Sequence, residues 1–166
     1  ASLRIVDGLE YKINIGFDRS AAERNTTIFP NLTDFNPKGK YVQNNLDSKN
    51  SLIEHYLTYN LLLDKHKFEA LGGFSYQKFE RSGTSFSIDG ITNQGVGVPP
   101  AINPGFAGTQ SGVSGYAQEN ELQSYFGRVN YTFNEKYLLT ASMRADGSTR
   151  FGENNKYGYF PSAALG

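Results

Sequence analysis

Runs in which apolar and polar side chains alternate constrain the fold of this chain more than any other feature. Over residues 9–18 the odd positions carry Leu, Tyr, Ile, Ile and Phe, and the even positions are polar apart from Gly16. Successive side chains of a β-strand point to opposite faces, so this run predicts a strand with one apolar and one polar face. A sheet of such strands needs an apolar layer against one face only, and that layer is either protein or lipid.

The same alternation recurs along the chain and predicts an all-β fold. The expected strands are 9–18, 52–63, 68–79, 122–133, 137–146 and 157–166. The expected connections are long over 19–50, short over 64–67, long over 81–120, short over 134–136 and long over 147–156. This order is typical of antiparallel up-and-down strands in an outer-membrane barrel, which has short periplasmic turns and long extracellular loops.

Two hairpin registers follow from the requirement that apolar residues face each other. Pairing Leu63 with Phe68 keeps one continuous apolar face across the first short turn. Pairing Phe133 with Tyr137 does the same across the second. Aromatic residues lie near the ends of these apolar faces, as in the interfacial girdles of membrane barrels. Tyr and Phe are also good strand formers in any sheet, so this feature alone leaves both interpretations open.

Composition excludes several classes of function. The 16 basic and 16 acidic residues leave no net charge, so nucleic acid is not an expected partner. The chain has no cysteine, which removes thiol catalysis, disulfides and cysteine metal sites. No apolar run reaches the ~18 residues of a membrane-spanning helix, whereas barrel strands need apolar residues only at every second position.

The sequence also lacks the motifs that carry catalysis. It contains no G-x-S-x-G elbow, no phosphate-binding P-loop and no H-E-x-x-H zinc motif. Its two histidines, His55 and His66, lie far apart in the sequence. The run Asp146-Gly147-Ser148 fails the calcium-loop pattern, which needs further Asp or Asn at alternate positions. We therefore expect no enzymatic activity, no cofactor and no metal site.

The C-terminal part of the chain resembles a known family. Residues 136–152, KYLLTASMRADGSTRFG, and 157–162, YGYFPS, are similar to a barrel segment in the second half of SusC/RagA-class TonB-dependent outer-membrane transporters. Shorter matches at 57–60, 66–68, 71–77 and 127–131 extend the resemblance over most of the chain outside the long connections. The most specific residues are Asp146, Gly147, Ser148, Arg150, Phe151, Gly152, Tyr157, Gly158, Phe160, Pro161 and Ser162. Ala145 and Thr149 depart from the usual pattern, which has Arg and Ser there.

The resemblance implies a fold and a function. Members of the family form a 22-stranded barrel in the cell outer membrane, filled by an N-terminal plug domain. They pair with a SusD-like surface lipoprotein and import glycans or peptides with energy delivered by TonB. We expect residues 1–166 to supply about six strands of the wall. The plug domain and the TonB-contacting segment are expected to be absent from this chain.

Two groups of residues are candidate sites. On the polar face, Arg128, Arg144 and Asp146 fall on adjacent strands and are candidates for contacts with the plug or the solute. The alternative for them is a salt-bridged structural cluster inside the wall. Asp146 and Arg150 also bracket the Gly-Ser-Thr turn, where they could contact a ligand or the lid; the alternative there is that Asp146 caps the turn and Arg150 packs on Tyr157 or Phe151. The second group comprises aromatic residues expected in the long loops, where they could stack on sugar rings, contact the lid protein or anchor the loop: Tyr41, Phe86, Phe106 and Tyr116.

Two other functions remain open on the sequence. A soluble carbohydrate-binding or adhesin-like β-sandwich would bury the apolar stripes in a protein core. A passive porin-type channel would have the same wall as the transporter, without a plug and without energy coupling. The transported molecule cannot be named from these residues.

Overall fold

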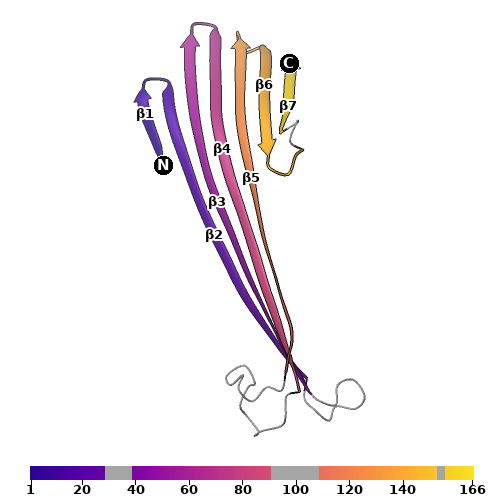
Figure 1. The fold of residues 1–166 in the computed structure, drawn as a ribbon. Helices are drawn as coiled ribbons and strands as arrows, with labels where there is room; N and C mark the ends of the chain where they lie inside the picture. Colours follow the sequence, from indigo (N-terminus) through magenta and orange to yellow (C-terminus); the bar gives the residue numbers. More distant parts are fainter. Residues whose placement is uncertain (29–38, 91–108, 153–155) are drawn as a thin grey trace. The chain divides into compact units, whose positions relative to one another are not determined.

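The computed structural model describes residues 1–28, 39–90, 109–152 and 156–166. The described chain is all-β, with one seven-stranded sheet in which every strand is hydrogen-bonded to its neighbours in the sequence (Figure 1). The strands are β1 (Ser2–Val6), β2 (Leu9–Ile28), β3 (Lys40–Leu63), β4 (His66–Asp89), β5 (Thr109–Phe133), β6 (Tyr137–Ser148) and β7 (Tyr157–Leu165). The antiparallel up-and-down order expected from the alternating connections is confirmed. No helix among the described residues is long and apolar enough to cross a membrane.

The chain divides into two compact units. Unit 1 comprises residues 1–18, 50–79 and 119–166, and unit 2 comprises residues 19–49 and 80–118. Unit 1 contains the alternating runs and the short turns, whereas unit 2 contains the polar continuations of β2 to β5.

In unit 1 the hairpin of β5 and β6 has the predicted register. Phe133 lies opposite Tyr137, Tyr131 opposite Leu139, and the pairing continues to Leu122 and Ser148 without a bulge. The turn over 134–136 uses positive φ angles at Asn134 and Glu135, of 51° and 55°. Strand β7 then pairs with β6 along its whole length.

The hairpin of β3 and β4 is tighter than predicted. Strand β3 ends at Leu63 and β4 begins at His66, so Asp64 and Lys65 alone form the turn. Asp64 has a φ of 47°, which Asp tolerates better than most residues. The predicted pairing of Leu63 with Phe68 is therefore wrong by two residues. Because side chains alternate with a period of two, this shift leaves the same residues on the apolar face.

Strand β1 was not predicted. It pairs with β2 through Leu3 opposite Tyr11, across a two-residue turn at Asp7 and Gly8. Asp-Gly is a strong hairpin signal, and Gly8 has a φ of 81°, which favours glycine. The signal was present in the sequence, but β1 is only 5 residues long and offers too little alternation to detect.

The expected long loops over 19–50 and 81–120 are wrong for most of their length. Strand β2 continues to Ile28, β3 already begins at Lys40, β4 continues to Asp89, and β5 begins at Thr109. Alternation marks a strand only where one face is apolar. Backbone hydrogen bonds hold a polar strand equally well when both of its faces meet water.

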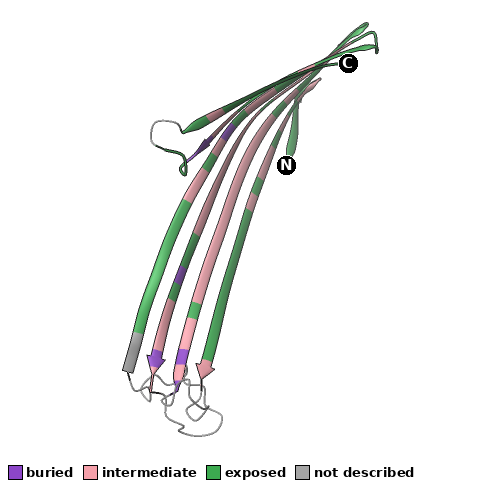
Figure 2. Ribbon diagram, turned by 90° about the vertical axis from the view of Figure 1, so that its right-hand side faces the viewer, coloured by how far each residue is buried: buried purple, intermediate pink, exposed green. Residues whose placement is uncertain are grey.

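Unit 2 contains the only buried hydrophobic side chains among the described residues. Tyr41 is 1% exposed and Ile88 is 8% exposed, and Phe86 packs against both. Gly39 and Gly90, both with positive φ, mark the ends of the paired region and are joined by a 3.0 Å backbone hydrogen bond. The other buried strand residues are small ones, Gly83, Ser124, Gly147 and Ser148, and most of the remaining strand residues are exposed or half-buried (Figure 2).

Candidate functional site

The polar face of unit 1 is held by hydrogen bonds between neighbouring strands. Asn130 donates to the carboxylate of Glu69 at 3.4 Å and accepts a hydrogen bond from the Thr140 hydroxyl at 3.0 Å. Gln77 donates to Asn50 at 2.9 Å on the same face. These residues come from β3, β4, β5 and β6, so side-chain hydrogen bonds join all four strands across the polar face.

Arg144 lies at the centre of the candidate site on this face. Its Nε is 2.7 Å from the Asp146 carboxylate, and its terminal nitrogen donates to the Ser124 hydroxyl at 3.3 Å. The guanidinium carbon is also 5.8 Å from the centre of the Phe126 ring, a cation–π distance. Arg128 lies opposite Ser142 on the same two strands.

The geometry around Arg144 agrees with the salt-bridged cluster considered from the sequence. Asp146 does not cap the turn as expected, because β6 continues two residues beyond it and its carboxylate binds Arg144. Since half of the Arg144 side chain is exposed, this ion pair is worth at most about 1 kcal/mol.

The apolar face of unit 1 exposes large hydrophobic side chains. Ile15, Phe17 and Met143 are 75%, 70% and 47% exposed. Aromatic rings cluster on neighbouring strands, including Phe68 against Tyr131 at 4.7 Å between ring centres. No described residue covers these side chains, so the apolar layer that the alternation requires is not supplied by this part of the chain.

Both histidines lie on this apolar face and both are paired with a tyrosine. Tyr11 Oη is 2.5 Å from Nδ1 of His55, and Tyr131 Oη is 2.7 Å from Nδ1 of His66. A polar atom facing hydrocarbon is costly unless it is hydrogen-bonded within the protein. The two pairs therefore fit a face that contacts lipid.

The family-like residues build the hairpin of β6 and β7. Gly147 lies opposite Tyr157, and a Cβ at position 147 would stand 2.7 Å from the tyrosine ring. Around the turn, the Ser148 hydroxyl accepts a hydrogen bond from the Arg150 amide at 3.2 Å. Glu121 and Thr149 are joined by two hydrogen bonds of 2.9 and 3.1 Å. The glycine is required because the aromatic ring occupies the space above it.

The rest of the signature follows the same principle. Gly158 leaves room for the Phe160 ring, which would be 3.1 Å from an added Cβ. Pro161 and Ser162 lie opposite Met143 and Ser142 in the ladder. Phe151 and Gly152 follow the turn at residues 149–150 that ends β6, before residues that the structure does not describe. This segment thus has a structural explanation that needs no ligand.

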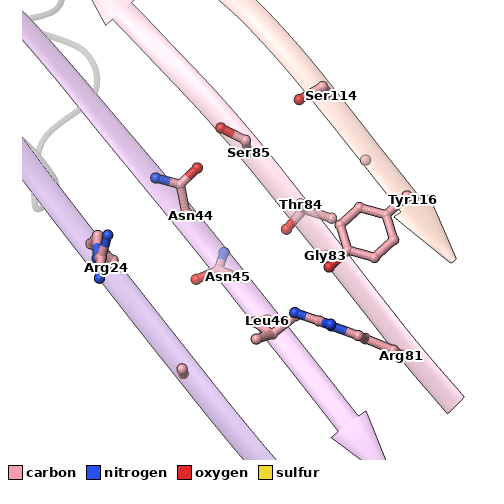
Figure 3. Close-up of a pocket in the computed structure, with 12 residues that line it drawn as sticks. Arg24, Asn44, Asn45, Leu46, Arg81, Gly83, Thr84, Ser85, Ser114 and Tyr116 are labelled. Atoms are coloured by element: carbon pink, nitrogen blue, oxygen red, sulfur yellow. The ribbon is translucent and has the colours of Figure 1, made fainter. Parts of the chain in front are cut away.

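Unit 2 carries an open groove with a volume of about 480 Å³ (Figure 3). Arg24 stands on β2, Asn44 on β3, Arg81 on β4 and Tyr116 on β5. The groove also presents the hydroxyls of Thr84, Ser85 and Ser114. It combines positive charge, hydrogen-bonding groups and one aromatic ring.

Most of the aromatic residues expected in loops lie on strands. Tyr41 and Phe86 form the small core of unit 2, with ring centres 5.9 Å apart, and the buried Tyr41 has no free surface for a ligand. Tyr116 is on β5 and lines the groove. Phe106 lies outside the described residues. Of the three that the structure describes, Tyr116 is the one that lies among groups that can bind a solute.

The sequence did not single out Arg24 or Arg81 as site residues. The sequence predicts a loop at each of them, and nothing in a loop predicts which residues meet. The one available signal concerns Arg81, which is the single basic residue in the stretch 81–120, rich in Gly, Ser and Asn.

Among the described residues, no group of three or more His, Asp or Glu side chains is arranged to hold a metal ion. In unit 2, burial raises the pKa of Tyr41 above its ordinary value of 10.0, and the negative charge of Glu23 raises it further. This phenol is therefore neutral at physiological pH.

Comparisons with known proteins agree with this geometry. No protein-family model matches the chain. TonB-dependent receptor P3 of Formosa agariphila is 37% identical over 175 residues, which cover 99% of this chain and 16% of the receptor. TonB-dependent receptor SusC of Bacteroides thetaiotaomicron is 36% identical over 111 residues, covering 67% of this chain and 10% of SusC. The solved structure of the RagAB peptide transporter matches 99% of this chain and 18% of its own, with a TM-score of 0.88 and 25% identity.

The sheet with one apolar and one polar face, matched over its whole length to solved transporters, defines the chain as part of the wall of a large antiparallel β-barrel. The chain belongs to the SusC/RagA family of TonB-dependent receptors. It spans about a sixth of the length of P3 and a smaller share of SusC.

Proposed function

We propose that this chain is part of the wall of an outer-membrane transporter that imports a nutrient with energy from TonB. The observation that carries the proposal is the apolar face of unit 1, where large hydrophobic side chains are exposed on adjacent strands. Soluble monomeric proteins rarely leave such a large contiguous apolar patch in contact with water. Lipid covers such a face in a closed barrel, where every strand edge is paired. The named relatives are receptors and a transporter and not enzymes, which supports transport over catalysis.

The partners follow from the family. A SusD-like lipoprotein would close the extracellular side, TonB would act through a part of the protein outside this chain, and the solute would be a glycan or a peptide. SusC and RagAB are the relatives that support this assignment. By this proposal the polar face of unit 1 lines the interior of the barrel, where Arg128, Arg144 and Asp146 meet the plug or the solute.

The test is to delete the gene that encodes the whole protein and to measure growth on single glycans and on peptides. The proposal predicts loss of growth on one nutrient class. It further predicts restoration by the intact gene and failure of restoration when TonB is inactivated. Growth that is unchanged on every nutrient would contradict it.

The two other candidate functions give different results. A passive channel would restore growth without TonB. A soluble β-sandwich would be recovered in the aqueous fraction without detergent, whereas the transporter is recovered from outer membranes only with detergent. The exposed apolar face favours the membrane protein, since a sandwich would bury it.

A further inference from the structure

The groove of unit 2 has an unbalanced charge. Its lining includes the guanidinium groups of Arg24 and Arg81 and no acidic residue. Both arginines are exposed, and within the described ranges neither makes an ion pair with an acidic side chain. A positive groove without internal partners attracts anions.

Two acidic residues of β2 and β3 lie around a different depression. Glu23 and Asp47 line it, and Asp47 is 2.6 Å from Arg19. Alternation along β2 places Glu23 on the face opposite to Arg24. On β2 the groove face therefore carries Arg24, whereas the acidic Glu23 lies on the opposite face.

Tyr116 provides a flat surface within the groove. A Cβ at Gly83 would stand 2.6 Å from the ring, so the ring lies in the space that the glycine leaves open. Figure 3 shows the ring beside Gly83 on β4, with Arg81 on the same strand. The side chain is 47% exposed, which leaves ring surface free for a solute.

The two arginines stand on strands separated by β3. Neighbouring strands are ~4.8 Å apart, so β2 and β4 are about 10 Å apart across the sheet. Asn44 from β3 and the hydroxyls of Ser85 and Ser114 present donors and acceptors to the same groove. A ligand that contacts both charges must therefore be extended and must itself carry hydrogen-bonding groups.

We infer that this groove is a binding subsite for an acidic oligosaccharide, a sugar chain bearing carboxylate or sulfate groups. Arg24 and Arg81 bind the anionic groups, since a guanidinium donates paired hydrogen bonds to a carboxylate or a sulfate. Tyr116 stacks on a sugar ring, and the amide and hydroxyl groups bind the sugar hydroxyls. An acidic peptide would match the charges but would not use the aromatic surface in this way. The inference rests on the proposed function and specifies its substrate class.

The experiment uses the complete receptor purified in detergent and isothermal titration calorimetry. The probes are tetragalacturonate, its fully methyl-esterified form, which has the same sugars without charge, a sulfated chondroitin tetrasaccharide and pentaglutamate. We expect tetragalacturonate or the sulfated sugar to bind and the methyl ester to bind at least about tenfold more weakly. Loss of one charged hydrogen-bonding partner has about this effect, so R24Q and R81Q should each weaken binding about tenfold.

Two controls keep the result specific. Arg19→Gln removes an arginine of unit 2 that is paired with Asp47 and lies outside the groove, and it should leave binding unchanged. Tyr116→Phe should retain most of the binding, whereas Tyr116→Ala should lose it.

Equal binding of the charged sugar and its methyl ester would overturn the inference, as would arginine variants without effect. Preferential binding of pentaglutamate would overturn it in favour of a peptide subsite, and binding of no probe would also count against it. The growth test of the proposed function is independent of these outcomes. A receptor that still imports a nutrient through TonB but binds none of the probes would refute the proposed binding subsite. It would leave the proposed transport function supported.

Discussion

The ring of Phe126 dictates the residue that faces it on the next strand. A Cβ at Gly73 would stand 2.3 Å from that ring and 2.9 Å from the backbone carbonyl of His55. Phe126 in turn packs on Tyr56, with ring centres 5.5 Å apart, and carries the guanidinium of Arg144 above it. Because Gly73 has no side chain, the Phe126 ring fits against β4, where it lies beneath the guanidinium of Arg144.

Adjacent glycines provide a matched test of this packing. Gly73→Ala should destabilise the barrel by about 1 to 3 kcal/mol, because both the ring and a backbone carbonyl must move. Gly72→Ala should have little effect, because nothing lies within 4 Å of its added Cβ. The measurement is the temperature at which the purified receptor loses its compact, SDS-resistant form. Equal changes for the two variants would contradict the packing described here.

Sequence reasoning succeeded at the residue scale only where alternation fixed the faces. It placed Arg128, Arg144 and Asp146 on one face correctly, since the register of β5 and β6 follows from apolar pairing. It could not find Arg24 or Arg81. The sequence around them has no clear alternation of apolar and polar residues. Without that alternation a single sequence does not predict which residues of neighbouring strands lie side by side.

At the scale of the strand, the main finding is that β2 to β5 are much longer than a membrane requires. A tilted strand crosses the hydrocarbon in about 9 to 11 residues, whereas β3 and β4 have 24 residues each. The apolar alternation predicted the segments of these strands that lie in unit 1, and it is absent from their continuations in unit 2. The extensions into unit 2 were missed for this physical reason, and with them the groove.

The small core of unit 2 has a measurable titration. Tyr41 lies near the start of β3, outside the alternating segment that faces lipid, and burial is the larger cause of its raised pKa. Glu23→Gln removes the second cause, so it should lower the pKa of Tyr41 while leaving it above 10.0. The difference in phenolate absorbance between the parent protein and its Tyr41→Phe variant isolates this group.

The sign of the effect on stability follows from the raised pKa. The contribution of Tyr41 is fully present below its unfolded value of 10.0 and is lost as the pH rises through the folded-state value. Tyr41→Phe cannot ionise and should show a smaller loss of stability above pH 10.0. A Tyr41 that titrates at its ordinary pKa would refute the burial described here.

At the scale of the whole molecule, the account depends on two unlike faces of one sheet. Hydrogen bonds between strands join side chains of the polar face of unit 1, and on the apolar face each of the two histidines is hydrogen-bonded to a tyrosine. On a surface in water such pairs only replace hydrogen bonds to water, so they contribute little to stability. In a barrel wall they are what allows histidine to face lipid.

The most direct test of this account is a scan of β6 with a fluorescent label in lipid vesicles. The chain has no cysteine, so single cysteines from Leu138 to Ala145 can carry the label without a background from these residues. Brominated lipid tails quench a fluorophore that they contact. The account predicts quenching at Leu139, Ala141, Met143 and Ala145 and little quenching at the positions between them. Uniform quenching, or quenching of the alternate set, would show that the apolar face does not meet lipid and would contradict the account.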